Sequence, residues 1–183
     1  MKSVSAASER RSDATERVIS AWRRERPDLE VAPMETWSRI TLLAKYLDQA
    51  RREVLSGHGL QSWEFDVLAD LRRAGAPYEL RPGQMTAQMM VTSGTMTNRI
   101  DRLEASGLVE RRSDAADGRV TQVRLTDAGR DAVDGALADL LQREAQLMAP
   151  LAQSQGGDLA AMLGTLLARF EAEGSAGPGG RAS

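Results

Sequence analysis

The segment SGTMTNRIDRLEASG carries side chains of the types that read nucleic-acid bases. When the segment is placed on a helical wheel at about 100° per residue with Met96 facing the core, Thr95, Asn98 and Arg102 turn away from that core. Asparagine can pair bidentately with adenine, arginine can bind guanine or phosphate, and threonine can contact a thymine methyl. An ordinary solvated helix face is the alternative. The candidate DNA-contacting residues on this helix are Ser93, Thr95, Thr97, Asn98 and Arg102.

Two short alternating segments follow directly, at residues 108–112 and 120–125, and are joined by SDAADGR. The pattern predicts a β-hairpin that would lie beside the helix as a wing. Arg119 at its tip could enter the minor groove, where narrow A·T tracts attract arginine. Arg111 and Arg112 at its base are expected to clamp phosphates.

The helix that carries these side chains needs a fixed start, a buried stripe and a defined end. Ser93 suits the N-cap, and Met96, Ile100 and Leu103 form the apolar stripe. Gly107 suits the left-handed stop that would let the next residue fold back on Leu103. A short helix opened by a proline precedes it at residues 82–90. The order predicts a winged helix-turn-helix within a mostly α fold that has a small β wing.

Further helices are predicted at residues 15–26, 34–55, 62–74, 126–148 and 158–170, with Gln-Gly-Gly separating the last two. The helices near both chain ends are apolar on more than one side. Burial against a second copy is the economical solution, so we expect a two-fold symmetric homodimer; an intramolecular bundle is the alternative. The predicted segments are a disordered N-terminus (1–14), an added helix and dimerisation helix (15–55), the DNA-binding lobe (56–125), C-terminal dimerisation helices (126–172) and a disordered tail (173–183).

Composition excludes several classes of function. Cysteine is absent, which excludes disulfides, thiolate metal sites and thiol redox switches. His58 is the only histidine and is expected in a loop, and there is no phosphate-binding glycine loop. We therefore expect neither an enzyme nor a metal or cofactor. Because no apolar run approaches a membrane span and no secretory signal is evident, a cytoplasmic location without membrane contact is expected. The net charge of −2 means that any DNA affinity depends on where the arginines lie.

Taken together, SGTMTNRIDRLEASGLVER, the DAADGR wing and the LTDAGR helix start resemble the MarR family of bacterial transcription regulators. The resemblance covers roughly residues 34–170. It implies an obligate dimer that binds double-stranded DNA at a pseudopalindromic promoter site. It further implies repression that a small molecule relieves.

The added N-terminal helix and WEFDVLADLRRAGAPYEL resemble the PecS-like, urate-responsive branch of this family. That resemblance implies an anionic effector such as urate bound by Trp22, Asp66 and Arg99. Ser56 stands at about the position where many members use an asparagine, and related proteins respond to trans-aconitate or citrate, so the ligand's identity stays open. The wheel independently places Arg99 about 60° from Met96, on the shoulder of the buried stripe, where a half-buried guanidinium needs an anion.

These residues suggest an electrostatic switch. In the free protein, Asp66 and Arg99 would pair and hold the recognition helix at the spacing that DNA requires. A planar anion would compete for Arg99 and stack on Trp22. A winged-helix DNA-binding protein without a ligand and a protein-interaction module that never touches DNA are the two other hypotheses.

Overall fold

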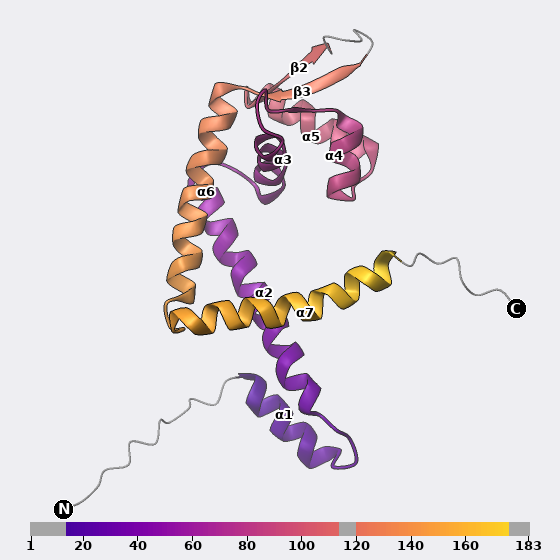
Figure 1. Ribbon diagram of the computed structural model, residues 1–183, viewed down its shortest axis with the longest axis vertical. Helices are drawn as coiled ribbons and strands as arrows, with labels where there is room; N and C mark the ends of the chain where they lie inside the picture. The colour runs from indigo at the N-terminus through magenta and orange to yellow at the C-terminus, as the bar shows by residue number, and fades with distance from the viewer. Residues whose placement is uncertain (1–13, 114–119, 176–183) are drawn as a thin grey trace, which may run out of the picture. The chain divides into compact units, whose positions relative to one another are not determined.

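The computed structural model describes residues 14–113 and 120–175, which form seven helices and three strands within those ranges (Figure 1). The chain divides into two compact units, Met1–Ser62 and Trp63–Ser183. The elements are α1 (Ala14–Glu25), α2 (Ala32–Gly57), α3 (Ser62–Arg73), β1 (Glu79–Leu80), α4 (Pro82–Met89), α5 (Ser93–Ala105), β2 (Val109–Ser113), β3 (Thr121–Leu125), α6 (Asp127–Met148) and α7 (Gln153–Ser175).

The first unit pairs the short helix α1 with the long helix α2. Ile19 of α1 is buried, whereas Trp22, one turn further along, is 47% exposed. An ion pair ties the two helices together, with Arg23 Nη2 lying 2.5 Å from Glu35 Oε1. Pro33 stands in the first turn of α2, where its missing N–H leaves no helical hydrogen bond unmade.

The second unit contains the predicted helix-turn-helix, made by α4 and α5, which pack against each other. The predicted stripe is confirmed, because Met96, Ile100 and Leu103 are all buried. The predicted N-cap was wrong by one residue. Thr92 caps α5, and its hydroxyl accepts a hydrogen bond from the backbone N–H of Thr95, while Ser93 is the first helical residue. A threonine is favoured as an N-cap for the same reason as a serine, so sequence alone could not separate the two.

The predicted stop of α5 is confirmed. Gly107 has a φ of +71°, and the N–H of Leu108 donates to the Leu103 carbonyl at 3.0 Å, as in a Schellman motif. The chain then enters β2, which pairs antiparallel with β3 in the register Val109 opposite Leu125. Figure 1 shows this hairpin projecting beyond α3, α4 and α5. The hairpin tip, residues 114–119, lies outside the described residues.

A third strand, β1, was not predicted from the sequence. Its two residues, Glu79 and Leu80, pair antiparallel with Arg124 and Val123, which gives the sheet order β1-β3-β2. A two-residue strand carries no periodicity of its own. Only the presence of β3 beside it makes it a strand.

Helix α6 begins directly after the wing. Thr126 is its N-cap, accepting from Gly129 N–H at 3.0 Å while donating its hydroxyl to the Gly107 carbonyl at 2.7 Å. Gly129 is buried against the loop before β2, and a Cβ at this position would lie 2.0 Å from the Leu108 carbonyl oxygen. Glycine is therefore what allows α6 to start this close to the wing.

The last helix is longer than predicted. It begins at Gln153, not near Asp158, so Gly156 and Gly157 lie inside α7 and do not separate it from α6. The hydrogen bond from Ala152 N–H to Gln155 Oε1, at 2.8 Å, helps to satisfy the helix start. At the other end α7 continues to Ser175, into the segment predicted to be a disordered tail. None of the helices within 14–113 and 120–175 has the length and apolar composition needed to span a bilayer.

Candidate nucleic-acid interface and ligand pocket

The exposed face of α5 carries the predicted base-reading residues. Figure 1 shows α5 beside the β2–β3 hairpin, as a winged helix-turn-helix requires. Because Met96 and Ile100 anchor the opposite face in the core, these side chains are held on the solvent side of a fixed helix. The residues on this face are all exposed: Ser93, Thr95, Thr97, Asn98 and Arg102.

Two of the hydroxyls on this face have partners close to the helix start. The Thr95 hydroxyl lies 2.9 Å from that of Thr92, and the Thr97 hydroxyl donates to the Ser93 carbonyl at 3.0 Å. The Thr97 proton is therefore directed at the backbone, which leaves its methyl group and oxygen lone pairs for a ligand. Thr97 is thereby better suited to an apolar contact with a thymine methyl than to donating to a base.

Trp63 of α3 supports two arginines of α5, a role that was not predicted from the sequence. The guanidinium carbon of Arg102 lies 4.8 Å from the Trp63 ring centroid, and that of Arg99 lies 5.5 Å from it. A guanidinium over an indole face is attracted to the ring while its edge N–H groups stay available as donors. Trp63 therefore orients one arginine predicted to bind DNA and one predicted to bind ligand. The spacing of Arg99 and Arg102 at i and i+3 was the available signal.

The structure gives Arg111 two carboxylate partners on α5. Its guanidinium pairs with Asp101 at 2.5 Å and with Glu104, and its backbone N–H donates to Glu104 Oε1 at 3.1 Å. Hydrogen bonding to Asp101, aided by Glu104, raises the pKa of Arg111 above its ordinary value. In this state Arg111 fastens the wing to the recognition helix, and a phosphate would have to compete with both carboxylates. The phosphate clamp at Arg111 stays a prediction.

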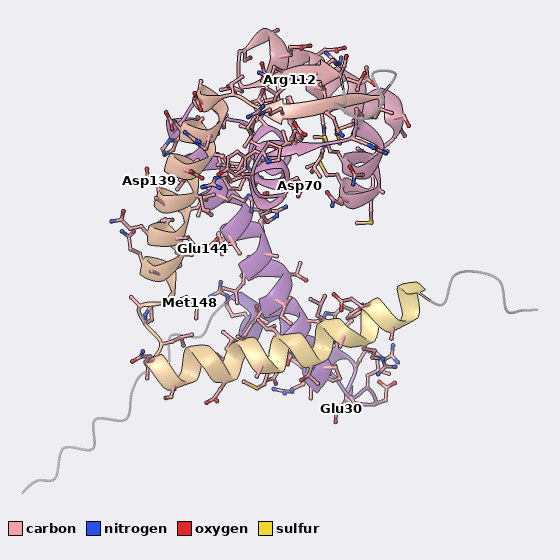
Figure 2. All side chains as sticks on the ribbon, turned by 45° about the horizontal axis from the view of Figure 1, so that its top comes forward. Glu30, Asp70, Arg112, Asp139, Glu144 and Met148 are labelled. Carbon is pink, nitrogen blue, oxygen red and sulfur yellow. The ribbon has the colours of Figure 1, made fainter. Side chains whose placement is uncertain are left out.

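Arg112 lies on β2 and is exposed (Figure 2). It is 2.6 Å from Glu110 on the same strand, a surface pair that a phosphate could displace at low cost because such pairs are weak. Arg119, predicted at the wing tip, lies outside the described residues.

A pocket of about 340 Å³ opens between α3, the end of α4 with the residues that follow it, and the middle of α5. Asp66 of α3 and Arg99 of α5 both line it, so the structure brings together two of the three predicted ligand residues. Asp66 is exposed on its helix and Arg99 is half-buried. The complete lining is Asp66, Asp70, Arg73, Gln88, Met89, Val91 and Arg99.

The third predicted ligand residue, Trp22, lies on α1 in the first unit with 47% of its surface exposed. Its part in the pocket stays a prediction, as does that of Ser56, which is exposed on α2. The pocket residues Asp70 and Arg73 were not predicted from the sequence. The available signal was their spacing, because Asp66, Asp70 and Arg73 recur at i, i+4 and i+7 along one face of α3.

Comparisons with known proteins agree with this architecture. The MarR family model matches residues 58–120. The HTH-type transcriptional regulator PecS of Dickeya dadantii is 37% identical over 150 residues, which cover 80% of this chain and 89% of that protein. Among solved structures, a MarR family protein from Bacillus stearothermophilus is similar with a TM-score of 0.66 and 23% identity, covering 75% of this chain and 94% of that one.

A mutant of MarR from E. coli, solved in complex with operator DNA, is similar with a TM-score of 0.61 and 24% identity, covering 75% of this chain and 95% of that one. These structures share the fold of the chain. The extent and identity of the match to PecS, together with the winged helix-turn-helix, show the family. The chain belongs to the MarR family and is a DNA-binding transcriptional regulator of the PecS type, not an enzyme.

Proposed function

We propose that the protein is a homodimeric repressor that binds a pseudopalindromic promoter site and is released by a small anionic ligand such as urate. One observation carries the ligand part of the proposal. Arg99, a residue of the recognition helix itself, lines a pocket together with Asp66 of α3. A ligand that binds there acts directly on the helix that reads DNA.

The DNA part of the proposal follows from the exposed face of α5. Thr95, Asn98 and Arg102 would contact base edges in the major groove, with Arg112 on phosphate and Arg119 in the adjacent minor groove. A two-fold dimer would place two such helices about 34 Å apart, one turn of the duplex. The similarity to the MarR mutant solved with operator DNA supports this arrangement.

The dimer part of the proposal is supported by apolar side chains left in solvent on α6 and α7. Large exposed apolar patches on a single chain mark association surfaces. Sedimentation should give a species of twice the 19.9 kDa chain mass at micromolar concentration. A monomer at that concentration would contradict the dimer. The exposed residues on these helices, together with Leu151 between them, are Leu137, Leu141, Leu147, Met148, Leu151, Met162, Leu163, Leu167 and Phe170.

The proposed switch acts through the position of Arg99. In the free protein the Arg99 guanidinium lies over the ring of Trp63. Trp63 and Asp66 are both residues of α3. An anion in the pocket would compete for Arg99 and change how α5 is held against α3. Release requires the ligand to bind the non-binding conformation more tightly by a few kcal/mol, since equal affinity shifts no equilibrium.

The test is a mobility-shift titration against the intergenic DNA upstream of the gene, at one fixed salt concentration, with and without urate. We expect a specific complex that urate releases. The Arg99→Ala variant should lose the response to urate, whereas Arg143→Ala, an exposed arginine on α6, should keep it.

Each part of the proposal can fail separately. If Arg99→Ala still releases DNA normally with urate, the pocket assignment is wrong. If the wild type forms a specific complex that no small anion releases, the protein is a regulator without a ligand. If no specific complex forms, the promoter-binding role fails.

A further inference from the structure

The pocket beside the recognition helix is lined by charges of both signs, and this restricts the chemistry of its ligand. This inference rests on the proposed function, because it concerns the ligand of the same site. Two carboxylates, Asp66 and Asp70, face two guanidinium groups, Arg73 and Arg99, so the formal charges of the lining cancel. A pocket built only to hold an anion would carry an excess of positive charge.

Asp70 forms an ion pair with Arg73, and Asp70 is the less exposed of the two side chains. Its side chain is 11% exposed and pairs with Arg73 one turn further along α3, whose side chain is 69% exposed. The carboxylate is thus held within the pocket wall while its partner extends toward solvent. A carboxylate fixed in this way accepts hydrogen bonds from a ligand but repels a second carboxylate.

The rest of the lining has the same mixed character. Gln88 brings an amide that can both donate and accept, and Arg99 brings N–H donors held over the Trp63 ring. Gln88 and Met89 also form the last turn of α4, the end of a helix that carries partial negative charge. Met89 and Val91 supply apolar surface suited to the face of a flat ring.

We propose that Asp70 is a specificity-determining residue, which selects flat heterocyclic anions that carry N–H donors and disfavours polycarboxylates. A ring of the urate type presents N–H groups to Asp70 and carbonyl or anionic oxygens to Arg99. A polycarboxylate such as citrate presents mainly carboxylates, which only accept at neutral pH, and its one hydroxyl donor stands among them, so its approach to Asp70 brings like-charge repulsion. Asp70 thereby separates two ligand classes that a guanidinium alone would not distinguish.

The test compares the binding of urate and citrate by calorimetry in the full-length wild type and in Asp70→Asn. The variant keeps the shape of the side chain, removes its charge and adds a donor. We expect it to weaken urate binding by roughly tenfold, the loss of about one charge-assisted hydrogen bond, and to strengthen citrate binding by a similar factor. Asp131→Asn, an exposed aspartate on α6 outside the pocket, should change neither affinity.

Arg73→Gln is the companion variant, because it removes the partner of Asp70 and leaves that carboxylate uncompensated. It should weaken citrate binding further, opposite in direction to Asp70→Asn, and circular dichroism should confirm that both variants are folded. Equal urate and citrate affinities in the wild type, or unchanged affinities in both variants, would overturn the role of Asp70 while leaving the ligand pocket in place. A wild type that binds neither compound would overturn the inference together with the ligand part of the proposed function.

Discussion

Replacing Gly129 with alanine tests how closely α6 must approach the wing. The added Cβ would lie 2.0 Å from the Leu108 carbonyl oxygen, 2.9 Å from the Leu108 carbonyl carbon and 3.2 Å from a Leu125 methyl carbon. Two of these three atoms are backbone, so no side-chain rotation relieves the overlap. The start of α6 must therefore move by about 1 Å or more for the Cβ to reach even a tight contact.

The expected cost follows from what that movement disturbs. Overpacking costs about 1–3 kcal/mol. The same Leu108 oxygen accepts a hydrogen bond from Thr126 N–H at 3.2 Å, and its loss costs about 0.5–1.5 kcal/mol. Alanine is a better helix former than glycine by about 1 kcal/mol, which offsets part of this. The net expectation is a loss of about 1–3 kcal/mol in the free energy of unfolding, or roughly 2–12 °C in melting temperature.

The assay is thermal and urea unfolding at one fixed protomer concentration, because the stability of a dimer depends on concentration. Gly157→Ala is the matched control, since Gly157 is also helical but a Cβ added there would have nothing within 4 Å of it. The control should be neutral or stabilised by up to about 1 kcal/mol. If Gly129→Ala were as stable as the control, helix propensity would outweigh the close approach and the packing argument would be refuted.

Three further predictions concern DNA binding and pH. Asn98→Ala should weaken specific binding by about 1–3 kcal/mol and leave binding to scrambled DNA unchanged, as mobility shifts on both sequences would show; equal losses on both would exclude a base contact. Arg111→Met should reduce stability by at most about 1 kcal/mol, because its pair with Glu104 is partly exposed. If Arg111 clamps a phosphate as predicted, the variant also lowers the salt slope of DNA binding by about 1, and an unchanged slope would contradict the clamp. Arg26 donates to Asp28 at 2.8 and 2.6 Å and lowers the pKa of that carboxyl, so the pair contributes stability above the ordinary aspartate pKa that is lost as the pH falls through the lowered value. Carbon NMR should show the Asp28 pKa rising toward its ordinary value in Arg26→Ala, and no change would contradict the pairing.

The local signals in the sequence determined the helix-turn-helix. The stripe of Met96, Ile100 and Leu103 and the glycine stop at Gly107 each depend on residues within a few positions of one another. Local geometry of this kind is encoded by periodicity and by backbone preference, and both can be recognised from the amino-acid sequence. The exposed base-reading face followed from the same periodicity.

Features that join distant segments were decided only by the tertiary structure. The strand β1 exists because β3 lies beside it, and Arg111 meets Asp101 and Glu104 because the hairpin folds back on α5. The Trp63 platform depends in the same way on the packing of α3 against its neighbours. Composition and spacing show which charges a chain carries, but not which of several nearby carboxylates an arginine will reach.

The ligand pocket shows the same division within one site. The resemblance to a family indicated Asp66 and Arg99. The structure added Asp70, Arg73 and Gln88, because α3, α4 and α5 place them around the same pocket. The sequence by itself determined the elements and the faces that they bury, because hydrophobic burial and capping act over a few residues. The tertiary structure decided the partners and the balance of charge around the ligand, because Coulomb interactions and hydrogen bonds depend on distances that no local pattern encodes.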